Sequence, residues 1–295
     1  MKENKKCIYL YLLFSFTLAW MIWIGCYWLR VPNIVSQLFA MLSMWAPAIA
    51  VWLTHTLTKT ENILAYSLKP KIKGNAKQYL YAWIIPIIAS ILGGLLYFCI
   101  FQNDFDISLT YLKQSLDLSE QTSNTTFTFI CAGIKFVAIV TFGSLLNTFL
   151  CLGEEIGWRG FLFPALAKEF PHIRAHLLAG LIWGLWHTPI NMLGHNYGLY
   201  YPGYPWLGII SMCVFTFSAG VVLSWLCEKS GTVWVAAFAH GSINAVAGAP
   251  MLFLTSGTAA HQVWGPGTTG LIAGLPLFML AVIILWHSNK PSESC

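Results

Sequence analysis

Two adjacent carboxylates and an arginine stand at the end of a long apolar run. Glu154, Glu155 and Arg159 follow the segment 129–152, in which Lys135 is the single charged residue. A charged group in the middle of a bilayer costs roughly 2.5–3.5 kcal/mol on insertion scales. Three such groups in one short window therefore serve either the structure of the protein or a chemical reaction.

The spacing of these three residues predicts different roles for the two acids. If the helix continues through them, Glu155 and Arg159 lie at i and i+4 on one face, with the acid first, which is the better order for an ion pair. Glu154 is turned by about 100° from that face and cannot share the arginine equally. We therefore expect Glu154 to be the less compensated carboxylate, which is the kind of group that serves as a general base.

Two further windows place polar residues inside apolar segments. Trp183 is followed four residues later by His187, and His240 is followed four residues later by Asn244. The second pair projects from one face of a helix, where two hydrogen-bond donors are suited to stabilising an oxyanion. Taken singly, such residues more often join helices by hydrogen bonds. A Glu–Arg pair can also anchor a helix end, so the functional interpretation depends on the joint occurrence of all three windows.

The composition places the chain in a membrane. Charged residues make up 9% and hydrophobic residues 57% of the sequence, whereas an ordinary soluble domain is about one-quarter charged. No basic cluster is interleaved with stacking aromatic residues, so no nucleic-acid partner is expected. The eight cysteines form no Cys-x-x-Cys pair, which argues against a zinc–thiolate site or a disulfide framework.

The apolar runs predict an all-α, polytopic membrane protein with about eight transmembrane helices and no separate soluble domain, so that 1–295 form a single membrane domain. About 20 apolar residues are needed for each span. Most Lys and Arg residues fall in segments on the side of the N-terminus, which predicts that both termini are cytosolic. The predicted spans are 8–29, 34–57, 79–101, 129–152, 175–193, 205–227, 231–254 and 268–286.

The depth of the polar residues presents a geometric problem. If the fifth span begins near residue 175, His187 lies about 18 Å inside the membrane, whereas Glu154 should lie much nearer to the cytosol. The two side chains can meet if the fourth helix is shifted outward, if the fifth begins later, or if both border a water-filled cavity. We expect such a cavity, open to the cytosolic side.

The three windows together resemble the CPBP family, the CAAX proteases and bacteriocin-processing (Abi) proteins, which include the type II CAAX prenyl endopeptidases. The resemblance is carried by Glu154-Glu155-x-x-x-Arg159, by Trp183-x-x-x-His187 and by His240-x-x-x-Asn244. It covers about 129–254 as a family-like catalytic core. The family usually has Phe in the second motif, and this chain has Trp183.

The resemblance implies an intramembrane endopeptidase that hydrolyses a peptide bond of a membrane-associated protein or peptide. Glu154 and His187 would activate a water molecule, and His240 and Asn244 would stabilise the oxyanion. Glu155, Arg159 and Trp183 would support the site. Because the family is often called metalloproteases, Zn²⁺ on Glu154, His187 and His240 is an alternative. The sequence contains no His-Glu-x-x-His motif, so we favour a glutamate-dependent mechanism without metal.

Two other functions fit parts of the sequence. A non-catalytic bacteriocin-immunity or membrane scaffold protein could use the same polar cluster for packing. A transporter is disfavoured because no repeated half with matching broken helices is visible. The substrate classes that stay open are prenylated proteins, leader or bacteriocin-type peptides and quorum peptides. The expected location is a bacterial cell membrane, or the endoplasmic reticulum membrane of a eukaryote, with the active site toward the cytosol.

Overall fold

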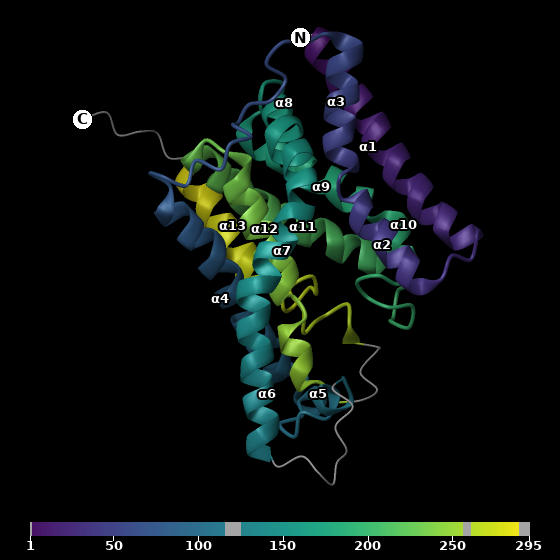
Figure 1. Ribbon diagram of the computed structural model, residues 1–295, viewed down its shortest axis with the longest axis vertical. Helices are drawn as coiled ribbons and strands as arrows, with labels where there is room; N and C mark the ends of the chain where they lie inside the picture. The colour runs from purple at the N-terminus through teal and green to yellow at the C-terminus, as the bar shows by residue number, and fades with distance from the viewer. Residues whose placement is uncertain (1, 116–124, 256–260, 289–295) are drawn as a thin grey trace.

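The protein folds as an assembly of helices, as the computed structural model shows (Figure 1). The structure describes residues 2–115, 125–255 and 261–288, and within these ranges the residues form helices, turns and isolated bridges but no strand. The predicted all-α fold is therefore confirmed. The helices before residue 125 are α1 (Lys2–Trp28), α2 (Asn33–Ser43), α3 (Ala46–Thr58), α4 (Ala76–Ile100), η1 (Gln102–Asp104) and α5 (Thr110–Ser115).

The second half of the chain contains the segments with the polar windows. Its longest feature is a nearly continuous rod of α-helices and two π turns, drawn in teal in Figure 1. The rod consists of α6 (Thr125–Ala138), η2 (Ile139–Gly143), α7 (Ser144–Gly157), η3 (Trp158–Leu162) and α8 (Phe163–Ala167). It is followed by α9 (His172–Trp186), α10 (Thr188–Met192), α11 (Trp206–Ser230), α12 (Val233–Val246), η4 (Ala249–Phe253) and α13 (Leu275–Ser288).

Within the described residues, five helices are long and apolar enough to cross a membrane, and a sixth span is obtained if α2 and α3 are counted together. These two helices meet at a bend of 44°. The protein is therefore a polytopic membrane protein. Besides the bent segment 34–57, two more of the eight predicted spans do not form one long helix each. The segment 175–193 is divided between α9 and α10 at His187, and the segment 268–286 contains only the short helix α13.

The fourth predicted span ends at residue 152, but the helical rod continues to Ala167. The reason is that the acids are followed by apolar residues and not by a turn signal. The two π turns each take one extra residue per turn and do not interrupt the rod.

Small residues allow the central helices to approach closely. A Cβ atom on Gly241 of α12 would lie 2.6 Å from the backbone nitrogen of Thr148 in α7. A Cβ atom on Gly153 of α7 would lie 2.7 Å from the carbonyl oxygen of Met44, where α2 meets α3. Glycine at such crossings is typical of helices that pack in lipid. These contacts place α7 between α3 and α12.

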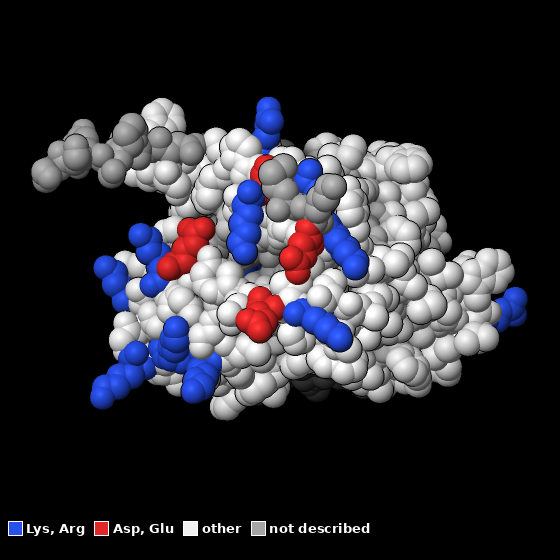
Figure 2. Space-filling view, turned by 90° about the horizontal axis from the view of Figure 1, so that it is seen from above, with Lys and Arg blue, Asp and Glu red and all other residues white. Residues whose placement is uncertain are grey.

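The start of α1 and the basic residues lie at one end of the molecule. The Asn4 side chain donates to the carbonyl of Ala165, and the Asn75 side chain donates to the carbonyl of Ser230, so the ends of α1, α4, α8 and α11 meet there. Figure 2 looks onto this end and shows Lys and Arg side chains spread over it. The exposed basic residues on these segments include Lys5, Lys6, Lys59, Lys69, Lys71, Lys73, Lys77, Lys168, Arg174 and Lys229. We refer to this end as the basic end.

Candidate active site

Glu155 is completely buried between two cationic or ionisable partners. Its Oε1 atom accepts a hydrogen bond from Nη1 of Arg159 at 3.0 Å, so the ion pair predicted from the i, i+4 spacing is present. The same oxygen lies 2.7 Å from Nδ1 of His240, which comes from α12. Because a carboxylate can only accept, His240 donates here. Glu155 therefore ties α7 to α12 and orients the imidazole ring.

Glu154 is held by two tryptophan indoles. Nε1 of Trp158 donates to its Oε2 atom at 3.0 Å, and Nε1 of Trp183 donates to the same atom at 2.7 Å. The carboxylate thus has no cation as its hydrogen-bond partner, as the sequence analysis expects, but it is not without partners. Trp158 was missed, although its i, i+4 spacing from Glu154 was a visible signal. Trp183 also stacks under the guanidinium of Arg159, whose Cζ atom lies 4.1 Å from the ring centroid.

His187 stands where α9 ends and α10 begins. Its Nδ1 atom lies 2.9 Å from the carbonyl oxygen of Trp183, so Nδ1 carries the proton and donates. In a neutral imidazole this leaves Nε2 as an acceptor for water or substrate. Pro189 supplies the early proline of α10 and lies two residues after His187. The helix break therefore presents the ring at a fixed position.

His240 and Asn244 project from the same side of α12, as predicted. The Nδ2 atom of Asn244 donates to Sγ of Cys151 in α7 at 3.4 Å. Asn244 keeps a second amide hydrogen for another acceptor. Cys151 was not singled out from the sequence, because a cysteine in an apolar run is usually a packing residue.

One cavity brings the predicted catalytic residues together. A cavity of about 360 Å³ is lined by side chains from α7, α9 and α12, among others. Glu155 and Arg159 do not line it and lie behind Glu154 and His240 in the interior. The predicted site residues that line the cavity are Glu154, Trp183, His187, His240 and Asn244.

The longer helical rod explains how Glu154 and His187 can lie at the same depth in the membrane. Glu154 precedes the end of α8 at Ala167 by 13 residues, which is about 20 Å along a helix. His187 follows the start of α9 at His172 by 15 residues, about 22 Å. Because α8 and α9 are joined at the basic end, the two side chains reach the same level. The shift of the fourth helix, one of the solutions that the sequence analysis considers, is the one observed.

The site cavity continues into a second cavity of about 640 Å³. Trp23, Gln37, Ala40, Ile190 and His195 line both spaces. The second cavity ends near Arg30, which follows the last turn of α1. Since α1 begins at the basic end, the cavity extends away from that end, whereas the sequence analysis predicts an opening on the cytosolic, basic side.

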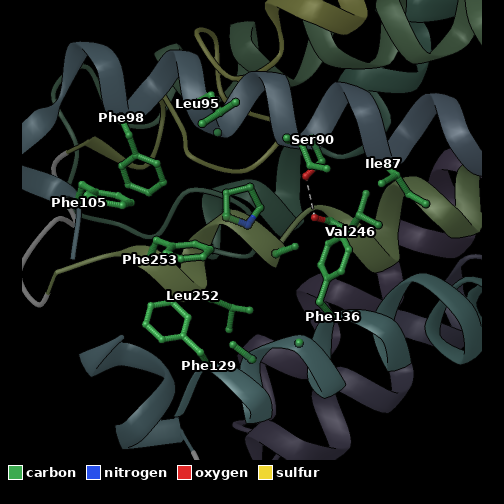
Figure 3. A pocket seen from close by; sticks show the side chains of 16 residues that line it. Ile87, Ser90, Leu95, Phe98, Phe105, Phe129, Phe136, Val246, Leu252 and Phe253 are labelled. Carbon is green, nitrogen blue, oxygen red and sulfur yellow. Dashed lines mark hydrogen bonds between the residues drawn. The ribbon is translucent and has the colours of Figure 1, made fainter. Parts of the chain in front are cut away.

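A third cavity is apolar and lacks the groups needed for hydrolysis. It has a volume of about 520 Å³ and lies between α4, α6 and η4, where the rings of Phe98, Phe105, Phe129 and Phe253 surround it (Figure 3). The polar contact drawn there is the hydrogen bond from Ser90 to a backbone carbonyl. No carboxylate or imidazole lines this cavity, so it is separate from the candidate active site.

The side chains at the site are not arranged as a set of metal ligands. Among the residues that the structure describes, no three His, Cys, Asp or Glu side chains are grouped closely enough to hold a metal ion. Glu154, His187 and His240, the ligands named in the metal alternative, share the cavity but do not converge on one point.

Comparisons with known proteins agree with this geometry. Residues 117–246 match the family model described as type II CAAX prenyl endopeptidase Rce1-like, a range that contains all three polar windows. The chain is also similar to CAAX prenyl protease 2 of the archaeon Methanococcus maripaludis, with 27% identity over 163 residues. That match covers 52% of this chain and 51% of the relative, so the chain spans about half the length of the curated relative. The family resemblance read from the sequence is confirmed.

Proposed function

We propose that this chain, a member of the CAAX protease family by its central region, is an intramembrane endopeptidase that cleaves a membrane-associated protein or peptide. The observation that carries the proposal is the shared cavity, where Glu154, His187, His240 and Asn244 meet from three separate helices. A general base, an imidazole with a free nitrogen and two donors around one space are the groups that peptide hydrolysis requires.

In the proposed reaction, Glu154 removes a proton from a water molecule that also contacts Nε2 of His187. The hydroxide attacks the peptide carbonyl, and the tetrahedral oxyanion accepts hydrogen bonds from the free amide hydrogen of Asn244 and from Nε2 of His240. Because Nδ1 of His240 is already bonded to Glu155, donation from Nε2 requires the imidazolium form, which the Glu155 carboxylate stabilises. Glu154 then returns its proton to the leaving amine.

We propose the same orientation in the membrane as the sequence predicts, with the basic end in the cytosol. The exposed lysines and arginines at that end support it (Figure 2). The two ends of the described chain lie on the same side, because α13 runs parallel to α11. Phe278 contacts Phe217, and further along both helices Ala281 and Leu285 pack with Val221. We propose that 1–295 form one membrane domain, with the catalytic core at about 129–254.

The proposed hydrolysis is tested by Glu154→Gln, which keeps the size and the acceptor oxygen but removes the base. Membrane peptides from cells that carry the parent chain or the variant are compared by mass spectrometry. We expect product peptides to fall by at least about 10³-fold, because a general base contributes about 10²–10⁴-fold and Glu154 also holds the water. Glu61→Gln, an exposed acid on the basic end, is the matched control.

The amount of each variant in membranes and its melting temperature are measured in parallel. Full product formation in Glu154→Gln would reject the mechanism. If Glu154→Gln lowers the melting temperature and the parent chain forms no product peptide, the non-catalytic scaffold or immunity function is supported instead.

A further inference from the structure

The cavity that continues the candidate active site is polar, although it is built from membrane helices. On α2, Asn33, Ser36 and Gln37 lie at i, i+3 and i+4 and all line the second cavity. The Nε2 atom of Gln37 lies 3.4 Å from Oδ1 of Asn33, so the two amides are neighbours on one face. Polar groups on a membrane helix face protein or water and not lipid. This face of α2 therefore borders a space that can hold water or a polar chain.

Arg30 stands at the far end of this cavity and has a free charge. It lines the cavity, and the described residues contain no carboxylate in an ion pair with it. The described acids on the same side of the molecule are engaged elsewhere. Asp104 accepts from Tyr97 and contacts Nδ1 of His261, and Asp106 accepts from two backbone amides where α5 begins.

The backbone around Arg30 is fixed by the turn that ends α1. Arg30 has φ of 51°, and its amide donates to the carbonyl of Tyr27, while the amide of Val31 donates to that of Cys26. The guanidinium therefore extends from a defined turn at the lip of the cavity. A guanidinium binds a carboxylate through two parallel hydrogen bonds, which is a directional contact that a lysine cannot reproduce.

The distance along α1 suits a short piece of peptide. Trp23 lines both cavities and marks their junction, and Arg30 follows it by seven residues. This separation corresponds to about 10 Å along a helix axis, and an extended peptide spans about 3.3–3.6 Å per residue. A few residues of extended chain therefore reach from the junction to the guanidinium.

We propose that the second cavity is the subsite for a part of the peptide substrate that carries a carboxylate, and that Arg30 binds this carboxylate. The proposal rests on the proposed function, since the cavity matters because it leads to Glu154. It also assigns the entrance of the site to the end of the molecule opposite the basic end. The carboxylate is either the C-terminus of the peptide or an acidic side chain near it.

The test measures binding without cleavage, using the full chain with Glu154→Gln in phosphatidylcholine nanodiscs. Three dansyl-labelled peptides are compared by fluorescence anisotropy: Leu-Ala-Leu with a free carboxylate, the same peptide as an amide, and an amidated peptide that ends in aspartate. We expect the free acid to bind about 10-fold more tightly than the amide, because the ionic, bidentate contact is lost in the amide. Tight binding of the aspartate amide would assign the contact to a side-chain carboxylate.

Arg30→Gln is expected to remove the preference for the acid, and Arg30→Lys to keep part of it. Lys113→Gln is the matched control, because Lys113 is a basic residue outside both cavities on the same side of the molecule. The proposal would be overturned if the Glu154→Gln chain showed no preference for the free acid, or if the preference were unchanged when Arg30→Gln is added to it.

A preference that disappears in nanodiscs containing phosphatidylglycerol would show that Arg30 binds the headgroup of an anionic lipid instead, which also overturns the proposal. Since no step of this assay requires hydrolysis, its outcome is independent of the product peptides that test the proposed function. Loss of acid preference with normal cleavage in cells would leave the hydrolytic mechanism intact.

Discussion

Trp183 does more at this site than its place in the motif suggests. The family resemblance implies only a supporting role for it, at a position where the family usually has Phe. In the structure its indole donates to Glu154 at 2.7 Å, and its ring lies under Arg159. This chain therefore has a hydrogen bond to its candidate base that a phenylalanine cannot make.

Trp183→Phe is expected to lower kcat/KM about 10-fold, mainly through kcat. A hydrogen bond to a charged group contributes about 1.5–3 kcal/mol, and part of this is kept because Trp158 still donates. The measurement is the rate at which a product peptide forms, for a peptide already identified by comparing cells that carry the parent chain with cells that carry Glu154→Gln.

Trp234→Phe serves as the control, since its indole donates to the carbonyl of Leu68, away from the cavity. Equal activity of the parent chain and Trp183→Phe would mean that the indole does not position Glu154.

For individual residues, the sequence predicts contacts within one helix, but it does not predict contacts between two helices. The pair of Glu155 and Arg159 followed from i, i+4 spacing alone. The bond between Glu155 and His240 joins residues that are 85 positions apart, and it depends on how α7 and α12 cross. No local pattern contains that information, and for the same reason the contact of Cys151 with Asn244 was missed.

At the scale of elements, the crossing of α7 and α12 determines the site. Gly241 directly follows His240 and lies close against α7, facing the backbone of Thr148. The ends of the helices were harder to predict than their existence. The rod runs on past Arg159 because apolar residues continue after the charged ones, whereas a hydropathy pattern places a boundary where the charges begin.

Gly241→Ala is expected to separate α12 from α7, because the added Cβ atom would lie 2.6 Å from a backbone nitrogen that cannot move aside. Overpacking of this kind costs about 1–3 kcal/mol. We expect a lower melting temperature and at least about 10-fold less product, since the His240–Glu155 contact is stretched.

Gly25→Ala is the matched control, because no heavy atom lies within 4 Å of the position of its Cβ. Normal melting and normal cleavage in Gly241→Ala would contradict the view that this crossing sets the geometry of the site.

At the scale of the whole molecule, the basic residues lie at one end and the cavity extends from the site toward the other end. The basic end is expected to face the cytosol, and the cavity leads from Glu154 toward Arg30 on the other side. The sequence predicted the distribution of charge correctly, because charge is read residue by residue. It could not predict the direction of the cavity, which depends on the bend between α2 and α3 and on the break between α9 and α10.

The orientation is tested with two single cysteines introduced at exposed positions, Glu61→Cys near the basic end and Ser108→Cys before α5. Cells are treated with a membrane-impermeant maleimide, and labelling is compared with that of the parent chain. We expect additional labelling of Ser108→Cys in intact cells and of Glu61→Cys only after permeabilisation. The reverse pattern would invert the orientation and place the Arg30 entrance in the cytosol.

The two π turns in the rod have a consequence for how such a site can change in evolution. Ile139–Gly143 precedes the acids and Trp158–Leu162 follows them, and each turn contains one residue more than an α-helical turn. Loss of one codon in either turn would restore ordinary helix there and leave the rod on both sides facing nearly the same way, because the wide turn is what accommodates the extra residue. The segment between them is therefore bounded on each side by a place where the chain could lose one residue while both acids keep their direction.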